Sequence, residues 1–221
     1  MIDTILVPQG AEYQAVRRGV GRTQLPTVIP IPVGPAPLSR YLKTWQQTNT
    51  IAGKKLLIMG LCGSLGPQHA IADVVLYRDC INRTKPGGAL PCDAALLAWL
   101  QQKIPTAAVV SALTSDRLVS YAQEKHQLAQ QYSATVVDME GFAALDVLHQ
   151  AGASVAMLRV VSDNAQHDLP DLAQAIGSDG TLHALPLAWG MMRQPIAAIR
   201  LIRGSLRGLK ALTAIARRVS Q

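Results

Sequence analysis

Two carboxylates follow an apolar run in the segment Val136-Val-Asp-Met-Glu-Gly141. The run reads as a buried strand, and Asp138 and Glu140 stand at its end on either side of Met139. Side chains two positions apart point to the same face of a strand, so we expect both acids to face one way. Acids at the start of a helix can simply complement its dipole. Glu140, at the strand end where α/β proteins form their sites, is the better candidate for binding a ligand.

Charged residues also mark the segment Leu158-Arg-Val-Val-Ser-Asp163. Arg159 interrupts an apolar strand, and because a buried arginine needs an acidic partner, Asp138 or Asp163 is expected beside it. Ser162 and Asp163 end the strand, where Asp163 could serve as a helix N-cap and nothing more. Two strand ends that carry carboxylates within one sheet nevertheless favour a shared binding or catalytic site.

Glycines punctuate the segment Gly60-Leu-Cys-Gly-Ser-Leu-Gly66, directly after an apolar run. Glycine lets a backbone come close to a ligand and aim its N–H groups at an anion. A dinucleotide cradle needs the spacing G-x-G-x-x-G with a helix behind it, whereas this segment has G-x-x-G-x-x-G followed by Pro67. Two interpretations stay open, a tight structural turn and a loop facing a sugar or phosphate, with Cys62 and Gly63 as candidate contacts.

The elements that must position these residues alternate between short apolar strands and longer helical patterns. Strands are predicted at Thr4–Pro8, Thr27–Val33, Lys55–Met59, Asp73–Tyr77, Ala107–Ser111, Ala134–Val137 and Val155–Val161. Helices are predicted at Pro37–Gln47, Asp93–Lys103, Ser120–Tyr132 and Gly141–Ala151. Asp93 and Ser120 are the expected N-caps. The alternation predicts an α/β domain with a largely parallel or mixed sheet.

The composition is that of a globular protein, with 221 residues of which 49% are hydrophobic and 16% charged. A chain of this size buries a core without disulfides. Cys62, Cys80 and Cys92 form no C-x-x-C pair, and the histidines lack metal-binding spacings, so we expect neither a disulfide nor a metal site. The N-terminus has no secretory pattern, and no apolar run approaches the roughly 18 residues of a membrane span. The expected location is cytoplasmic.

The net charge of +7 is concentrated near the C-terminus. Between Gly180 and Gln221 no acidic residue occurs, and the basic ones are Arg193, Arg200, Arg203, Arg207, Lys210, Arg217 and Arg218. Apolar residues recur there at steps of three and four beside a basic stripe. We expect a basic amphipathic helix over 195–221, packed on or appended to a domain of residues 1–194. Its charge indicates an acidic partner, either a membrane surface or a nucleic acid.

Three motifs occur in the order G-L-C-G-S-L, V-D-M-E-G and L-R-V-V-S-D, and an Ala-Asp-Val-Val strand follows the first. Their order and spacing resemble those of the nucleoside phosphorylase and nucleosidase superfamily over about residues 3–165. The resemblance implies a three-layer α/β/α sandwich around a mixed central sheet, a homo-oligomer without a cofactor, and cleavage of an N-glycosidic bond. It further implies that Asp163, beside Ser162, hydrogen-bonds N7 of a purine. Glu140 would bind the ribose hydroxyls, and Met139 would pack under the sugar.

The choice between water and phosphate as attacking group depends on Glu12. The opening Ile5-Leu-Val-Pro-Gln-Gly-Ala-Glu12 is similar to the hydrolytic branch, in which a glutamate after the first strand holds the water. A carboxylate there would repel a phosphate dianion, which arginine donors suit better. Phosphorolysis, with phosphate as co-substrate, stays an alternative because Arg17, Arg18 and Arg40 are possible phosphate ligands. A solvated Glu12 in a first helical turn is another.

The segment Ser111–Leu118 departs from the hydrolytic branch, because it lacks the phenylalanine that stacks the base there. Its candidate substrate contact is Ser115. Later in the chain, Leu169-Pro170, Asp179-Gly180 and Arg193-Gln-Pro195 resemble the hopanoid-associated branch. That branch implies adenosylhopane as substrate, with adenine and ribosylhopane as products.

A nucleosyl lipid resides in a membrane, to which a basic helix at 195–219 would bind. The alternative is that this helix packs on the domain with its basic face in water. Two hypotheses of another class also stand: a nucleoside-binding or membrane-docking protein without turnover, and nucleic-acid binding through the tail. The rest of the chain lacks aromatic residues interleaved with basic ones, so we expect no nucleic-acid partner.

Overall fold

The computed structural model describes residues 1–21, 26–84, 88–172, 177 and 184–221, so the motif Asp179-Gly180 lies outside the described residues. A mixed sheet of eight strands has the order β2-β1-β3-β7-β6-β4-β5, with β8 paired to both β3 and β4. The strands are β1 (Thr4–Pro8), β2 (Thr27–Ile31), β3 (Lys55–Ser64), β4 (Val74–Asn82), β5 (Ala89–Pro91), β6 (Ala108–Thr114), β7 (Val136–Asp138) and β8 (Ser154–Asp163). The helices are α1 (Ala11–Val20), α2 (Pro35–Thr48), α3 (Ala94–Lys103), α4 (Ala122–Tyr132), α5 (Gly141–Gln150), α6 (Ala184–Arg193) and α7 (Pro195–Ser220).

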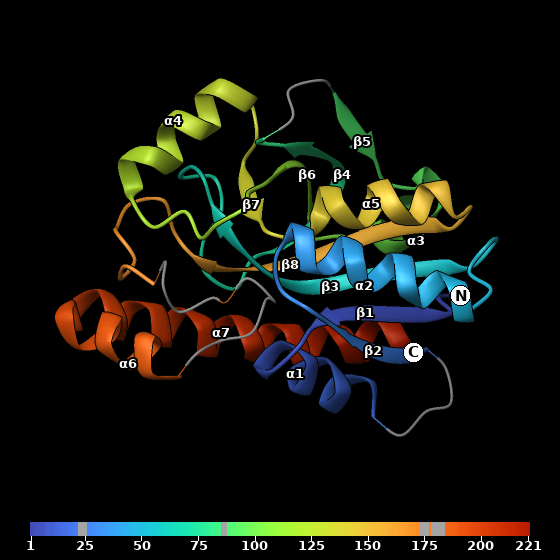
Figure 1. Ribbon diagram of the computed structural model, residues 1–221, viewed down its shortest axis with the longest axis horizontal. Helices are drawn as coiled ribbons and strands as arrows, with labels where there is room; N and C mark the ends of the chain where they lie inside the picture. Colours follow the sequence, from blue (N-terminus) through green and yellow to red (C-terminus); the bar gives the residue numbers. More distant parts are fainter. Residues whose placement is uncertain (22–25, 85–87, 173–176, 178–183) are drawn as a thin grey trace.

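Helices cover both faces of this sheet, with α2 and α5 on one side and α1 and α7 on the other (Figure 1). On the first side, Leu38 and Leu145 belong to one buried apolar cluster. On the other, Val16 of α1 and Leu212 of α7 belong to a second cluster. The predicted three-layer α/β/α fold around a mixed sheet, with a basic amphipathic helix at the C-terminus, is confirmed.

The long strands β3 and β8 form the centre of the molecule. They pair in parallel from Lys55 with Ser154 to Gly63 with Asp163. Every residue of β8 after Ser154 is buried. This explains the near-continuous apolar sequence of the strand, because strands covered on both faces have no solvent-facing positions. Their carboxyl ends bring the glycine-rich segment and the Ser162–Asp163 pair together.

The glycine-rich segment forms a strand over most of its length, so the loop or tight turn expected there was wrong as a backbone conformation. Strand β3 continues through Gly60 and Gly63 to Ser64. Two neighbours hold it in place, since Gly60 pairs with Arg159 of β8 and Gly63 pairs with Val137 of β7. Ladder hydrogen bonds on both sides outweigh the low strand propensity of glycine.

The helix α6 and the short strand β5 were not predicted, and α1 was expected only in the alternative that put Glu12 in a first helical turn. Helix α1 is polar on average but buries Ala15 and Val16, which is enough to hold it against the sheet and α7. Asp93 caps α3 as expected, accepting a hydrogen bond of 2.9 Å from the Leu96 N–H. The expected cap at Ser120 was wrong, because α4 begins one residue after Tyr121 and has no side-chain cap.

Helix α7 runs unbroken for 26 residues, and its glycines mark close approaches to the sheet. A methyl group at Gly204 would overlap the carbonyl oxygen of Ser162. One at Gly208 would lie 3.0 Å from Cδ2 of Leu61. The helix therefore lies directly on the ends of β3 and β8.

Within the described part of the chain, no helix combines the length and apolar character needed to cross a membrane.

Candidate active site

A cavity of about 450 Å³ lies where the ends of β1, β3, β7 and β8 meet the helices α6 and α7. Its polar wall includes the three acids expected at the site, Glu12, Glu140 and Asp163. Met139, Ser162, Cys62 and Gly63 also line it. The structure thus brings together seven of the eight expected site residues, which come from four separate segments of the chain. The eighth is Ser115.

Glu12 lies in the first turn of α1, after a sharp bend at Gly10 with φ +93°. The residue is partly exposed, but its carboxylate turns inward and accepts a hydrogen bond of 2.7 Å from the Leu61 N–H. Burial raises the pKa of this carboxyl from 4.5 to about 7, against the opposing effect of Arg159. A group with this pKa can take up a proton near neutral pH, as a general base must.

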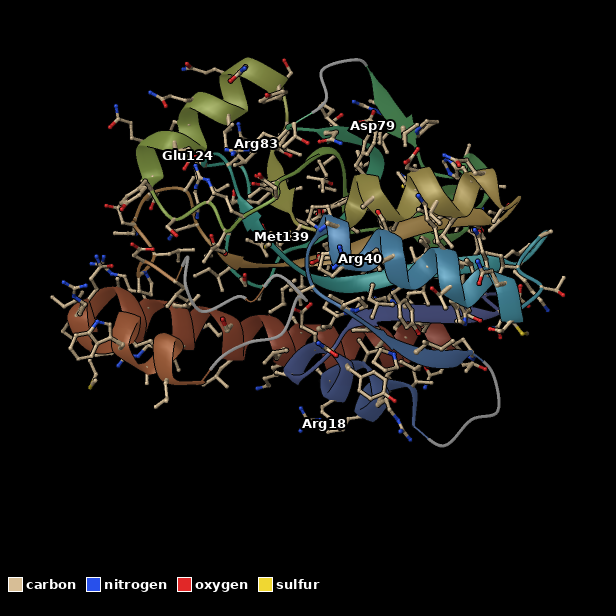
Figure 2. All side chains as sticks on the ribbon, in the orientation of Figure 1. Arg18, Arg40, Asp79, Arg83, Glu124 and Met139 are labelled. Carbon is tan, nitrogen blue, oxygen red and sulfur yellow. The ribbon has the colours of Figure 1, made fainter. Side chains whose placement is uncertain are left out.

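Glu140 stands at the start of α5 and is 4% exposed. Its Oε1 accepts a hydrogen bond of 3.1 Å from the Gly34 N–H, and its Oε2 lies 3.4 Å from Arg159. Burial raises the pKa of Glu140, while the Arg159 charge opposes that shift. Met139, at the centre of the side-chain view (Figure 2), lines the same cavity. This strand end therefore presents one acidic and one apolar side chain to a ligand.

Arg159 is the cation at the back of the site. Its partner is Asp138, at 3.0 Å, and not Asp163, the other candidate. Asp138 also accepts hydrogen bonds from the Thr114 hydroxyl at 2.9 Å and the Gly141 N–H at 3.1 Å. A side chain at Gly60 would overlap both Arg159 and Glu12, so glycine is needed there to let these charges approach.

Asp163 is 8% exposed and is held on both oxygens. Oδ1 accepts a hydrogen bond of 3.0 Å from the Ser162 hydroxyl, and Oδ2 contacts the ammonium group of Lys125. Lys125 was not predicted as a functional residue. The only trace of it in the sequence is the spacing, because Lys125 stands three residues before Leu128 and so shares with it the face of α4 that the structure buries. It was hidden by the polar composition of α4, which resembles that of a solvated helix.

Ser115 does not line the cavity, although it was expected to contact substrate. Its side chain is fully buried, and its hydroxyl accepts a hydrogen bond of 3.3 Å from the Arg117 N–H. The residues that follow it, Arg117, Leu118 and Val119, line the cavity instead. Ser115 thus stabilises the loop that lines the cavity but does not line the cavity itself.

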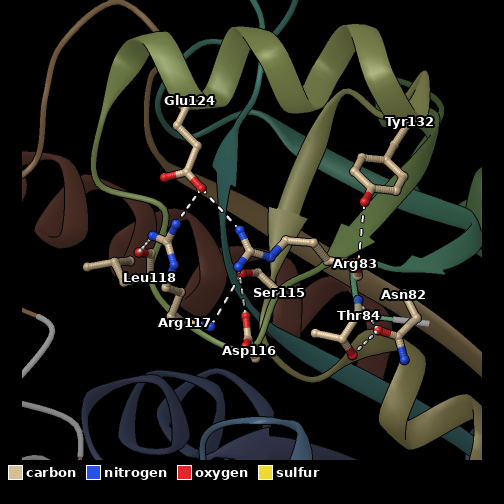
Figure 3. A network of polar contacts seen from close by, with 9 residues as sticks. All are labelled: Asn82, Arg83, Thr84, Ser115, Asp116, Arg117, Leu118, Glu124 and Tyr132. Carbon is tan, nitrogen blue, oxygen red and sulfur yellow. Dashed lines mark hydrogen bonds and ion pairs between the residues drawn. The ribbon is translucent and has the colours of Figure 1, made fainter. Parts of the chain in front are cut away.

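An ion network fixes this loop (Figure 3). Glu124 of α4 lies 2.6 Å from Arg117 and 3.1 Å from Arg83, and Arg83 lies 3.2 Å from Asp116. Cys62, Cys80 and Cys92 are free and buried. Burial raises the pKa of each thiol, so these cysteines are poor nucleophiles.

The arginines considered as phosphate ligands lie elsewhere. None of Arg17, Arg18 and Arg40 is among the residues that line the cavity. Arg18 is on α1 at the outer edge of the molecule (Figure 2). No aromatic ring is among the described lining residues either. Nor do the residues described by the structure include a group of three or more His, Cys, Asp or Glu side chains arranged to hold a metal ion.

The part of the cavity wall that α6 and α7 form is mostly apolar. It consists of Met191, Leu201, Ile202, Ser205 and Leu206, and Leu172 also lines the cavity. Ile202 and Leu206 are 44% and 62% exposed, so they also belong to the outer surface. The cavity therefore opens onto an apolar part of the molecular surface.

Comparison with known proteins identifies relatives of this arrangement. The family model described as "Phosphorylase superfamily" matches residues 15–181. Among solved structures, the 5'-methylthioadenosine/S-adenosyl homocysteine nucleosidase of Helicobacter pylori is 15% identical, with a TM-score of 0.72, over 98% of this chain and 96% of that one. A putative nucleosidase of the same kind from Borrelia burgdorferi, bound to adenine, is 13% identical, with a TM-score of 0.71, over 99% and 98%. The futalosine hydrolase of Helicobacter pylori is 14% identical, with a TM-score of 0.70, over 98% and 96%. Among curated proteins no match was found.

Proposed function

Because the chain belongs to the phosphorylase superfamily, we propose that it is an enzyme that hydrolyses the N-glycosidic bond of a purine nucleoside-type substrate. The observation that carries this proposal is the convergence of Glu12, Glu140 and Asp163 on one cavity. Structural neighbours of this chain include nucleosidases and a hydrolase, and the proposed reaction is of the same class as theirs.

The reaction develops charge at two places, and the cavity has an acid near each. Breaking the bond leaves a cation-like sugar and an electron-rich base. Glu140 accepts hydrogen bonds from the ribose hydroxyls and places negative charge near the cation. Asp163 faces the base and supports protonation at N7. Such acid assistance typically contributes a factor of about 10²–10⁴ in rate.

Glu12 acts on the attacking water. Its carboxylate, with a pKa of about 7, is fixed by the Leu61 N–H and lies near the Arg159 charge. As general base it takes one proton from water while the oxygen bonds to C1′ of the sugar. A phosphate dianion at this position would meet the charges of Glu12 and Glu140, so the geometry favours water over phosphate.

The test is release of adenine from adenosine and 5′-substituted adenosines, with and without phosphate. Hydrolysis predicts equal rates in both buffers, with ribose or the corresponding 5′-substituted ribose as product. A requirement for phosphate, with ribose 1-phosphate as product, would eliminate hydrolysis and the role of Glu12. Absence of turnover together with tight nucleoside binding would favour the alternative of a non-catalytic binding protein.

The substrate that we propose carries a large apolar group at its 5′ end, as adenosylhopane does. The support is that the apolar side chains Met191, Leu201, Ile202 and Leu206 line the same cavity as the acids. A small polar nucleoside would leave these side chains in contact with water, whereas a hydrocarbon substituent would bury them. The products would be adenine and ribosylhopane.

We propose in addition that the outer face of α6 and α7 binds the surface of an anionic membrane. Apolar side chains protrude there, namely Leu185, Trp189, Met192, Ile196, Ile199, Ile202 and Leu206. Beside them, Arg200, Arg203 and Arg207 line a second cavity of about 260 Å³ that also borders Asp163. Apolar residues flanked by arginines match the interface between acyl chains and phosphate headgroups. Because Ile202 and Leu206 belong to both surfaces, a docked enzyme would open its cavity towards the lipid.

A further inference from the structure

A buried lysine lies behind the carboxylate that faces the base. Lys125, in the first turn of α4, is completely withdrawn from solvent. Its ammonium group contacts Oδ2 of Asp163 and donates a hydrogen bond of 2.9 Å to the carbonyl oxygen of Asn164. Lys125 does not itself line the cavity, so its contact with the site runs through Asp163.

Asp163 is the acidic partner of Lys125. The preceding residue, Glu124, is engaged with Arg83 and Arg117 instead. Within the part of the chain that the structure describes, no second carboxylate lies within ion-pair distance of Lys125. A buried ammonium without a partner is strongly disfavoured, so the charge of Lys125 is tied to Asp163.

The hydrogen bonds of Asp163 raise a question about protons. Both of its oxygens already accept, one from Lys125 and the other from the Ser162 hydroxyl. An ionised carboxylate is only an acceptor, and N7 of a purine is an acceptor too. The two can join by a hydrogen bond only if the carboxyl group gains a proton. The ammonium group of Lys125, in contact with Oδ2, is a group that can release one.

We propose that the acid at the base end of the site is the Lys125–Asp163 pair, with Lys125 as a positioning residue that stores the proton. This rests on the proposed function. When the bond between C1′ and N9 breaks, its electron pair goes to the base. Asp163 gives a proton to N7 and receives one from Nζ of Lys125. The outcome is a neutral protonated purine, an ionised carboxylate and a neutral amine, which solvent later reprotonates.

The experiment compares two leaving groups in the wild-type protein and in Lys125→Met. Adenosine needs a proton on its base, whereas 4-nitrophenyl β-ribofuranoside has a leaving group that departs without one. We expect kcat for adenosine to fall about 10²–10⁴-fold, the range of general acid catalysis. The nitrophenyl substrate should lose less than about fivefold, because it does not use the acid. Lys43→Met, at an exposed position of α2, is the matched control.

A second variant keeps the proposal testable if Lys125→Met unfolds, which circular dichroism would reveal. Lys125→Ala leaves space for ethylammonium, and added ethylammonium should restore adenosine cleavage more than nitrophenyl riboside cleavage. Parallel losses on both substrates, or no loss on either, would overturn the proposal and leave hydrolysis by the wild type intact. Wild-type protein that releases neither leaving group would instead overturn the proposed function, and this inference with it.

Discussion

The guanidinium group of Arg159 lies 3.0 Å from the carboxylate of Asp138, and neither side chain reaches solvent. Asp138 ends β7 and Arg159 lies within β8, so the pair joins the two strand ends that supply Glu140 and Asp163. The same guanidinium lies 3.4 Å from Glu140. One buried cation thus balances two buried acids at the back of the cavity.

Replacing Arg159 by Met should destabilise the protein strongly. The substitution leaves Asp138 and Glu140 as buried acids without their cation, and breaking such an arrangement costs about 3–5 kcal/mol. Urea unfolding monitored by circular dichroism measures this loss. Arg78→Met is the control, because the Arg78 side chain is 64% exposed in its pair with Asp79 and should change stability by less than about 1 kcal/mol. Equal losses in the two variants would contradict the role of Arg159.

Glu12→Gln should change how stability depends on pH. The pKa of Glu12 is about 7 in the folded protein and 4.5 ordinarily, so the folded state holds this proton more tightly than the unfolded state. That contribution is complete below about pH 4.5 and is lost as the pH rises through 7. Glutamine removes the titration. Between pH 5 and 8 the free energy of unfolding of the variant should therefore rise relative to that of the wild type. The rise is at most about 3 kcal/mol, and screening by water reduces it because Glu12 is partly exposed.

Activity should follow the opposite direction. A general base works when ionised, so wild-type hydrolysis should increase as the pH rises through about 7, the pKa of Glu12. Glu12→Gln should be nearly inactive at every pH. Thermal unfolding and adenine release, each measured from pH 5 to 8, check the two statements separately. A stability difference that does not vary with pH would contradict the assigned titration.

Much of this arrangement could be predicted from short motifs, since each motif ends a buried strand. The segments 136–141 and 158–163 were expected to meet, and their acids do line one cavity. What could not be predicted depends on tertiary contacts. Lys125 lies in a helix of polar composition, and only the fold shows that its side chain is inside. The extension of β3 through Gly60 depends on two neighbouring strands rather than on local propensity.

Glu140→Gln should impair catalysis more than folding. Glutamine fills the same volume and can still accept the hydrogen bond from Gly34, but it lacks the charge that faces the sugar. We expect kcat/KM to fall by about 10²–10³, which is roughly 3–4 kcal/mol of transition-state stabilisation. Asp146→Asn, at an exposed position on the same helix, is the control and should retain full activity. A near-normal kcat/KM in Glu140→Gln would remove this residue from the site.

Gly204→Ala should reduce both stability and activity, although alanine favours helices by up to about 1 kcal/mol. The added methyl would overlap the carbonyl oxygen of Ser162, a backbone atom that cannot move aside cheaply. Overpacking of this kind costs about 1–3 kcal/mol, and it would displace the residue next to Asp163. Gly208→Ala is the matched control, because its new methyl would come closest to the end of the Leu61 side chain, at 3.0 Å, and no nearer than 3.6 Å to the backbone of β8. Equal melting temperatures of the two variants would show that the packing of Gly204 against the Ser162 carbonyl oxygen does not limit the stability of the protein.

Binding to anionic vesicles should depend on the exposed face of α6 and α7. Deleting residues 195–221 is not a clean test, because Leu212 and Ala216 are completely buried. Point variants are better, and Ile196→Glu/Ile199→Glu alters two side chains that are 67% and 49% exposed and do not line the active-site cavity. Arg200→Gln/Arg203→Gln removes two basic groups, each worth about 1 kcal/mol near such a surface, so affinity should fall roughly 30-fold.

The vesicles should contain phosphatidylserine in phosphatidylcholine, with pure phosphatidylcholine as the neutral comparison. Trp189, which is 60% exposed on α6, should shift its fluorescence to shorter wavelength when the wild-type protein binds. Lys43→Gln/Lys54→Gln removes two exposed charges outside α6 and α7 and should bind like the wild type. Because neither α7 variant alters the acids, both should still hydrolyse a water-soluble nucleoside. A different outcome would contradict membrane binding: the wild-type protein does not bind the vesicles but forms a dimer, and Ile196→Glu/Ile199→Glu disrupts that dimer. This face would then bind a second copy of the chain and not a membrane.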